Sequence, residues 1–261
     1  MNVLSEIIAK KGQRLSEARR LVNIEQLQRE ASAKRQSATP HALRRALEGE
    51  AINVIAEFKR RSPSKGVIRA DADLISMVRN YEAGGAAAIS VLTEEDYFDG
   101  SLEDLRLVKK SVGLPVLRKD FIFDEYQAFE SAAAGADAML LIVAVLDDQQ
   151  LESLRELAED ELRMDALVEV HNEEEMDRAA QSGATLIGIN NRDLRTFEVA
   201  LETSLKLASL APRYGFLVSE SGLSSASDLR TLKEHGFRGF LMGESLMRAR
   251  DPEQALRDLR E

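Results

Sequence analysis

Charged side chains stand near the ends of apolar runs, where a buried strand would not be expected to carry them. In residues 54–66, "VIAEFKRRSPSKG", a period of two places Glu57 and Lys59 on one face of a strand. The same rule places Asn190 and Arg192 on a shared face. A carboxylate and an ammonium group that face the same way supply a base and an acid at one place, so the pattern indicates acid–base chemistry.

Four more polar residues follow other apolar runs: Lys119, Glu169, Glu220 and Ser221. Each taken alone has an ordinary explanation, since strand ends meet water. Their convergence on one site is harder to explain that way, because an unpaired buried charge costs several kcal/mol. We therefore predict that they share one reaction site.

The elements that must position these residues alternate along the chain. From residue 52 on, eight short apolar runs alternate with eight amphipathic segments of helical period. This pattern predicts an α/β fold, a (β/α)8 TIM barrel, whose reacting groups lie at the carboxyl ends of its strands. A doubly wound open sheet is the alternative, but it seldom runs to eight uninterrupted units.

The first 50 residues precede this pattern and have helical periodicity of their own. We expect residues 1–50 to form an N-terminal helical extension packed on the barrel of residues 51–261, as a lid over one barrel end. A regulatory or dimerising arm is the alternative. The sequence does not define the oligomeric state, and a monomer is compatible with it.

Composition excludes several classes of site and partner. The chain of 261 residues has a formal net charge of −10, no cysteine and three histidines. The negative charge argues against nucleic acid and anionic membranes as partners. The lack of cysteine excludes disulfides, thiolate zinc sites and cysteine nucleophiles, and no spacing suggests a metal site. No apolar run approaches the roughly 18 residues of a membrane span, and the N-terminus lacks a signal peptide, so we expect a cytoplasmic protein.

Loops rich in glycine and serine follow three of the predicted strands. "SPSKG" follows the first, "SESG" the seventh and "MGES" the eighth, each near a helix start, where free N–H groups favour a phosphate. The last two are the usual phosphate position in such barrels. Ordinary turn chemistry is the alternative explanation. The residue pattern thus predicts a barrel enzyme that acts on a small phosphorylated molecule.

At these residues the chain closely resembles the indole-3-glycerol phosphate synthase family. The motifs that carry the resemblance are "VIAEFKRRSPSKG", "ISVLTEEDYFDGS", "PVLRKDFIFDEYQ", "LVEVHNEEE", "IGINNRDLRTFEV", "VSESG" and "LMGESLMRARDP". The resemblance implies that the chain cyclises 1-(2-carboxyphenylamino)-1-deoxyribulose 5-phosphate, with loss of CO2 and water, in tryptophan biosynthesis. It also implies that the reaction needs no metal and no organic cofactor.

The resemblance also assigns roles to the site residues. It makes Lys119 the general acid for ring closure and Glu169 the carboxylate for dehydration, with Glu57 beside it. Lys59 either pairs with the substrate carboxylate or protonates the leaving hydroxyl. The remaining assignments are Asn190 and Ser221 to the catalytic set, Arg192, Glu220, Phe98 and Phe121 to the substrate, and Ser62, Gly222, Gly243 and Glu244 to its phosphate. Glu244 would act through its backbone N–H, and core packing is an alternative role for Phe121.

An acid in this role is expected to titrate near neutral pH. A free lysine has a pKa of about 10.4, and burial or the neighbouring Lys59 is expected to lower the pKa of Lys119 toward about 7–8.

Two other functions compete with this one. Phosphoribosylanthranilate isomerase is a related barrel enzyme, but its family uses a cysteine that this chain lacks. The second alternative is a barrel without catalysis that serves as a phosphate-binding or subunit-interaction module. Such a module would have no need for a set of acids and bases.

Overall fold

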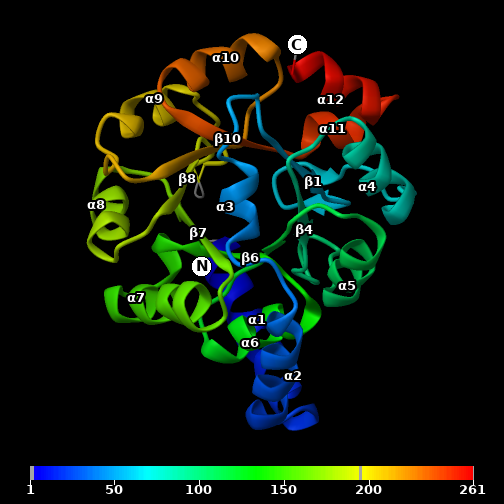
Figure 1. The fold of residues 1–261 in the computed structure, drawn as a ribbon, viewed down its shortest axis with the longest axis vertical. Helices are drawn as coiled ribbons and strands as arrows, with labels where there is room; N and C mark the ends of the chain where they lie inside the picture. The colour runs from blue at the N-terminus through cyan, green and yellow to red at the C-terminus, as the bar shows by residue number, and fades with distance from the viewer. Residues whose placement is uncertain (1–2, 194–195, 261) are drawn as a thin grey trace.

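Eight parallel strands close into a barrel in the computed structural model, which describes residues 3–193 and 196–260 (Figure 1). Each strand pairs with the next along the chain, and the last pairs with the first. The barrel strands are β1 (Val54–Phe58), β4 (Ala88–Leu92), β5 (Val116–Lys119), β6 (Ala138–Ile142), β7 (Asp165–Val170), β8 (Leu186–Asn190), β9 (Phe216–Glu220) and β10 (Phe237–Met242). The prediction of a (β/α)8 barrel is confirmed.

A helix follows each barrel strand and covers the outside of the barrel (Figure 1). These helices are α4 (Leu74–Ala83), α5 (Leu102–Ser111), α6 (Glu125–Ala134), α7 (Asp148–Glu156), α8 (Glu173–Gln181), α9 (Glu202–Ala208), α10 (Ala226–Glu234) and α12 (Pro252–Arg260). Several begin where a side-chain oxygen accepts a backbone N–H, as at Ser101, Asp124 and Asn172. Such caps satisfy N–H groups that the helix leaves free, which explains where these helices start.

The barrel strands separate two apolar cores. In β1, Val54, Ala56 and Phe58 join the layer between the strands and the outer helices. Ile55 instead joins the cluster that fills the barrel interior. Because side chains alternate along a strand, Glu57 continues the inward row of Ile55 and reaches the carboxyl end of the barrel.

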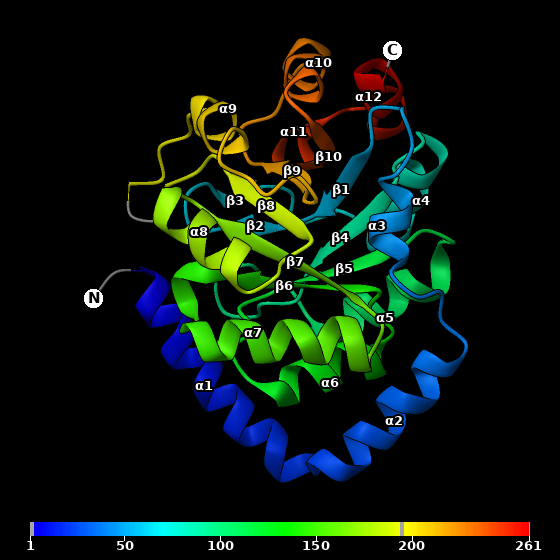
Figure 2. The same ribbon diagram turned by 60° about the vertical axis from the view of Figure 1, so that its left-hand side comes forward.

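The N-terminal extension covers more of the barrel than one end. It consists of α1 (Val3–Leu21), α2 (Ile24–Gln36) and α3 (Ala42–Ala46), and α1 and α2 form the two arms of a V (Figure 2). Leu27 and Ala31 are buried where α2 packs against α6. Leu43 and Leu47, from α3 and its end, are fully buried in the interior cluster. The extension therefore covers one side of the barrel and also fills part of its interior.

Several short elements were not predicted. The loop after β1 forms a small hairpin of β2 (Arg61–Ser62) and β3 (Gly66–Val67), and α11 (Glu244–Arg248) precedes α12. A 3-10 turn follows β6 at Val143–Val145, and a π-helical turn at Leu157–Glu161 continues α7. None of the helices in the described ranges has the length and hydropathy needed to cross a lipid bilayer.

Candidate active site

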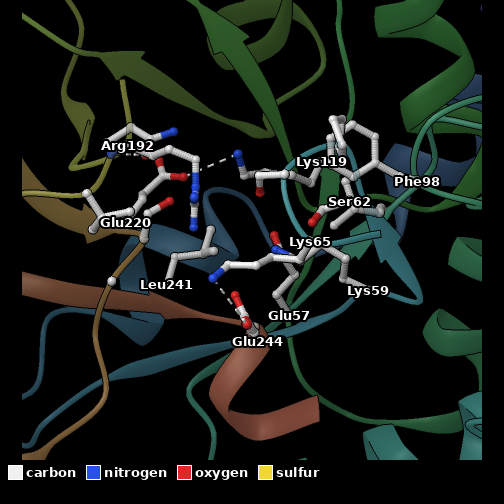
Figure 3. Close-up of a pocket in the computed structure, with 18 of the residues that line it drawn as sticks. Glu57, Lys59, Ser62, Lys65, Phe98, Lys119, Arg192, Glu220, Leu241 and Glu244 are labelled. Carbon is white, nitrogen blue, oxygen red and sulfur yellow. Dashed lines mark hydrogen bonds and ion pairs between the residues drawn. The ribbon is translucent and has the colours of Figure 1, made fainter. Parts of the chain in front are cut away.

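One cavity of about 710 Å³ opens at the carboxyl ends of the barrel strands (Figure 3). The structure brings every residue predicted for the site to its wall. These residues are Glu57, Lys59, Ser62, Phe98, Lys119, Phe121, Glu169, Asn190, Arg192, Glu220, Ser221, Gly222, Gly243 and Glu244. They come from most of the barrel strands and the loops that follow them, so the closure of the barrel assembles the site.

The β1 strand contributes an ion pair to the cavity. Lys59 Nζ lies 2.6 Å from Glu57 Oε1, and the Glu57 side chain is almost fully buried. The period-two prediction for this strand therefore holds. Gly243 lies directly against the pair, because a Cβ at this position would crowd Glu57 Oε1. A glycine after β10 is thus needed to seat the carboxylate of β1.

Lys119 is the centre of a buried charged cluster. Its Nζ lies 2.8 Å from Glu169 Oε2 and 3.2 Å from Glu220 Oε2, so that it joins carboxylates from β7 and β9. Glu169 and Glu220 are both 1% exposed. Within the described ranges, Lys119 is the one cation at ion-pair distance from the Glu220 carboxyl group.

The predicted lowering of the pKa of Lys119 is wrong in direction. Burial lowers this pKa, but the carboxylates of Glu169, Glu220 and Glu57 outweigh burial, and the net shift is upward. Lys59, the expected positive neighbour, is paired with Glu57 instead. Lys119 is therefore held as an ammonium group.

The two carboxylates beside Lys119 respond in opposite ways. Burial raises the pKa of Glu169. Lys119 and the contact with His171 lower this pKa by more than burial raises it, so the net shift is downward. Burial raises the pKa of Glu220 to about 8, because Lys119 offsets burial only in part and Glu169 adds repulsion. At neutral pH Glu169 is therefore ionised, and Glu220 is the member of the pair that holds a proton.

Two residues that support this cluster were missed in the sequence. Gly188 on β8 leaves room for Glu220, since a Cβ there would overlap Glu220 Oε1. His171 follows β7, and its Nε2 lies 3.2 Å from Glu169 Oε1. Of these two residues, only His171 could have been found from the sequence. It lies two residues after Glu169, so the period of two places both side chains on the same face.

One wall of the cavity is aromatic and apolar. The rings of Phe98 and Phe121 meet with centroids 6.2 Å apart and a tilt of 42°. Val3, Leu4 and Ile7 of α1 also line the cavity, and the sequence did not indicate them. A flat aromatic substrate group would fit this wall, because rings pack well against tilted aromatic neighbours.

Asn190 and Arg192 stand on the opposite wall. Asn190 Oδ1 accepts the backbone N–H of Arg192 at 3.0 Å, which fixes the two residues relative to each other. The Arg192 guanidinium donates to the carbonyl oxygen of Phe197 at 3.0 Å. Arg192 lines the cavity, and a guanidinium group has five N–H donors, so it can also bind an anion there.

The rim of the cavity is built from the loops after β1, β9 and β10. Ser62 comes from β2, and Ser221 and Gly222 turn the chain with φ of 66° and 78°. Two cations, Lys65 and Arg248, line the same part of the cavity. Arg248 Nε pairs with Glu244 Oε1 at 3.2 Å. Lys65 Nζ lies 4.0 Å from the same oxygen (Figure 3). The Glu244 carboxylate is therefore balanced by positive charge.

The comparison with known families decides between the barrel enzymes. The family model described as indole-3-glycerol phosphate synthase matches residues 4–259. The chain belongs to the indole-3-glycerol phosphate synthase family. The match includes the N-terminal extension as well as the barrel, so α1 to α3 are part of the family's design.

Individual members of the indole-3-glycerol phosphate synthase family are similar over 80–97% of the chain. The protein of that name from Desulfotalea psychrophila is 47% identical over 249 residues, covering 95% of this chain and 94% of the relative. The one from Carboxydothermus hydrogenoformans is 45% identical over 258 residues, covering 97% of each. The one from Lachnoclostridium phytofermentans is 49% identical over 209 residues, covering 80% of this chain and 77% of the relative.

Solved structures of lower sequence identity share the barrel. The 3-hexulose-6-phosphate synthase from Salmonella typhimurium superposes with a TM-score of 0.65 at 14% identity, covering 80% of this chain and 96% of that one. The KGPDC from Streptococcus mutans has a TM-score of 0.62 at 15% identity, covering 80% of this chain and 96% of that one. At such identity the likeness supports the fold and says nothing of the reaction.

One group of carboxylates in the described ranges has a spacing that could suit a metal ion: Glu94, Glu95 and Asp96 after β4. Their oxygens already have partners. Glu94 accepts the backbone N–H groups of Asp96, Tyr97 and Phe98. Glu95 pairs with Lys11, and Asp96 pairs with Arg14, both from α1. In this member of the indole-3-glycerol phosphate synthase family, the group fastens a loop and α1 to the barrel.

Proposed function

We propose that the Lys119 cluster carries out the family's reaction in this chain, the cyclisation of 1-(2-carboxyphenylamino)-1-deoxyribulose 5-phosphate to indole-3-glycerol phosphate. The observation that carries the proposal is the buried ammonium group of Lys119, 2.8 Å from Glu169 and 3.2 Å from Glu220, in a cavity lined by further charges. The reaction is a carboxy-lyase step of tryptophan biosynthesis, and its substrate is a small phosphorylated molecule.

Lys119 is the proposed acid for ring closure. As the ring carbon that carries the carboxylate attacks the ketone, the ketone oxygen becomes an alkoxide and takes a proton from Lys119. An alkoxide is more basic than an amine, so the raised pKa of Lys119 does not prevent this transfer. The raised pKa ensures that the proton is present at neutral pH. Loss of CO2 then restores the aromatic ring.

Glu169 is the proposed base for the dehydration that follows. This step removes a proton from the indoline and delivers one to the hydroxyl that leaves as water. Glu169 has a lowered pKa and is ionised, as a base must be. Glu57 and Lys59 form a second acid and base pair, in which the Lys59 ammonium group can deliver a proton to the leaving hydroxyl and the Glu57 carboxylate can accept one.

The rest of the wall is proposed to bind the substrate. Phe98 and Phe121 would flank the anthranilate ring, and Arg192 would pair with its carboxylate through two parallel hydrogen bonds. The phosphate would lie at the rim formed by Ser62, Gly222, Gly243 and the backbone of Glu244. Lys65 and Arg248 supply positive charge there, as a dianion requires in a chain of net charge −10.

We also propose that one chain suffices for the reaction and that it acts in the cytoplasm without nucleic acid. The charged and aromatic groups that the mechanism requires all line a cavity within a single chain. The phosphate and carboxylate of the substrate prevent it from crossing a lipid bilayer unaided, so enzyme and substrate must share one compartment.

The experiment is a fluorescence assay for indole-3-glycerol phosphate with the purified chain. We expect Lys119→Ala to lower kcat by about 10²–10⁴-fold, the usual contribution of a general acid. Glu169→Gln should lower kcat by a similar factor with little change in KM. Undiminished turnover by Lys119→Ala would refute the acid assignment. Failure of the unaltered chain to turn over the substrate would instead favour a barrel that only binds.

A further inference from the structure

His171 is a buried titratable residue beside the site for which the proposed mechanism has no role. It lies two residues after Glu169, and its side chain is 10% exposed. Its Nε2 lies 3.2 Å from Glu169 Oε1, an ion-pair contact rather than an aligned hydrogen bond. Its Nδ1 lies 2.9 Å from Glu175 Oε2 on α8. The imidazole ring thus links the candidate base to the first turn of a helix.

Glu175 is held firmly in its place. Its Oε2 accepts the backbone N–H of His171 at 2.8 Å, and its Oε1 accepts the Asn172 side-chain amide at 2.8 Å. Asn172 is the N-cap of α8, and its own side chain accepts the backbone N–H of Glu175. This reciprocal arrangement fixes the Glu175 carboxylate, so it can anchor the His171 ring.

Both ring nitrogens of His171 face carboxylate oxygens. A neutral imidazole has one N–H, so it would set a bare lone pair against one of the two carboxylates. The doubly protonated ring presents an N–H to each. Burial lowers the pKa of His171, but the contacts with Glu169 and Glu175 outweigh it and raise this pKa to about 10. Geometry and charge both indicate an imidazolium.

Glu169 therefore lies between two cations from different elements. Its Oε2 faces Lys119 at 2.8 Å, and its Oε1 faces His171 at 3.2 Å. Among the described residues, Glu220 has one cation at ion-pair distance, Lys119, at 3.2 Å. Two buried carboxyl groups that share one lysine are not easily ionised together. The second cation favours Glu169 as the ionised member and leaves the proton with Glu220.

We propose that His171, anchored by Glu175, is a positioning residue that orients Glu169 and keeps it the ionised member of the Glu169–Glu220 pair. This inference rests on the proposed function, in which Glu169 is the base. The alternative is that His171 only stabilises the start of α8, in which case its replacement would affect folding but not the titration of Glu169.

Kinetics of two variants separate these roles. His171→Asn keeps a donor toward Glu175 but withdraws it from Glu169, whereas His171→Gln keeps a neutral donor that can reach Glu169. We expect His171→Asn to lower kcat about tenfold with KM within about twofold, and His171→Gln to recover part of the loss. The acid limb of the kcat–pH profile should move to higher pH in His171→Asn, because the pKa of Glu169 rises without the cation.

Glu175 provides the second test. Glu175→Gln should lower kcat in the same way as His171→Asn, and combining the two should cost little more than either alone, because both act through one contact. Glu174→Gln is the matched control, since it neutralises an exposed glutamate of the same helix turn. Equal kcat and equal pH profiles for His171→Asn and the unaltered chain would overturn the inference, as would full additivity of the two changes.

Nuclear magnetic resonance of the imidazole nitrogens tests the charge independently of activity. The chain has three histidines, and the signals lost in His171→Asn identify those of His171. We expect a doubly protonated ring at pH 8 in the unaltered chain and an earlier deprotonation in Glu175→Gln. A neutral ring at pH 7 would overturn the inference whether or not the chain is active. Absence of turnover with a doubly protonated ring would refute the proposed function and leave the charge of His171 supported.

Discussion

At the scale of single residues, Glu220 is the buried carboxyl group of the site whose charge would be least balanced by cations. It is almost fully buried, and Lys119, the one cation that contacts it in the described part of the chain, lies closer to Glu169. Burial and the repulsion from Glu169 raise the pKa of Glu220 to about 8, whereas an unfolded glutamate titrates at about 4.3. Between these pH values the folded chain binds a proton that the unfolded chain releases. The free energy of unfolding contributed by Glu220 is therefore fully present below about pH 4.3 and is lost as the pH rises toward 8.

Replacing Glu220 by glutamine should remove this loss. We expect the free energy of unfolding of Glu220→Gln, relative to the unaltered chain, to be more favourable at pH 8 than at pH 5. The upper limit is about 1.4 kcal/mol per pH unit, the value of a full proton difference. Urea unfolding at the two pH values measures the difference. An exposed glutamate, Glu234, provides the control, and a relative stability of Glu220→Gln that does not depend on pH would contradict the raised pKa.

At the scale of elements, α1 is the clearest case of a helix whose position depends on distant partners. It buries Ile7, Lys11 and Leu15, a stripe with a spacing of four residues. Lys11 Nζ lies 2.8 Å from Asp120 and 2.8 Å from Glu95. Because Asp120 directly follows Lys119, this ion pair joins the extension to the strand that carries the proposed acid.

Loss of the Lys11 charge should destabilise the chain strongly. Lys11→Met leaves Asp120 buried with a partner removed, and breaking such a buried pair costs about 3–5 kcal/mol. Arg118 also pairs with Asp120, so the lower end of that range is the expected result. Urea unfolding checks it. The control is Lys10→Met, which removes an exposed lysine of the same helix that lies over the Tyr97 ring and should cost under about 1 kcal/mol. Equal stability of the two variants would show that the buried pair contributes nothing.

At the scale of the whole molecule, the extension and the barrel share one core. The residues that α3 contacts lie at the amino ends of strands: the Arg44 backbone N–H donates to Asp165, at the start of β7, and Asn53, just before β1, donates to the carbonyl oxygen of Leu47. Leu43 and Leu47 therefore close the barrel interior at the amino ends of the strands, opposite to the cavity. We propose that residues 1–50 fold together with residues 51–261 as one unit.

Leu43→Ala tests this unit. It should lower the free energy of unfolding by about 2–5 kcal/mol, the usual cost of a cavity in a close-packed core. It should leave kcat at 25 °C unchanged, because the cavity lies at the other end of the barrel. Thermal unfolding and the indole fluorescence assay measure the two effects. Leu21→Ala, at a leucine that is 85% exposed, is the control. A loss of stability no larger than that of Leu21→Ala would mean that the extension does not belong to the core.

Much of the barrel and its site could be predicted from local patterns. Side-chain alternation is a property of any strand, so Glu57 and Lys59 could be placed on one inward face before the barrel was known. Parallel strands that alternate with helices bring their carboxyl ends to one edge, and this topology assembled the predicted residues around one cavity. Short apolar runs and their polar ends carry this information within a few residues of chain.

The charges of the site depend on distances between strands that no local pattern contains. Electrostatic interaction varies with separation and with burial, and both are set by packing between segments far apart in the sequence. The wrong direction expected for the pKa of Lys119 is the clearest example, because the two carboxylates nearest to it come from β7 and β9. The same holds for Gly188 beneath Glu220 and for α1 at the cavity wall. The order of residues thus specified which groups meet, while the folded barrel established how closely they meet and which of them carry charge.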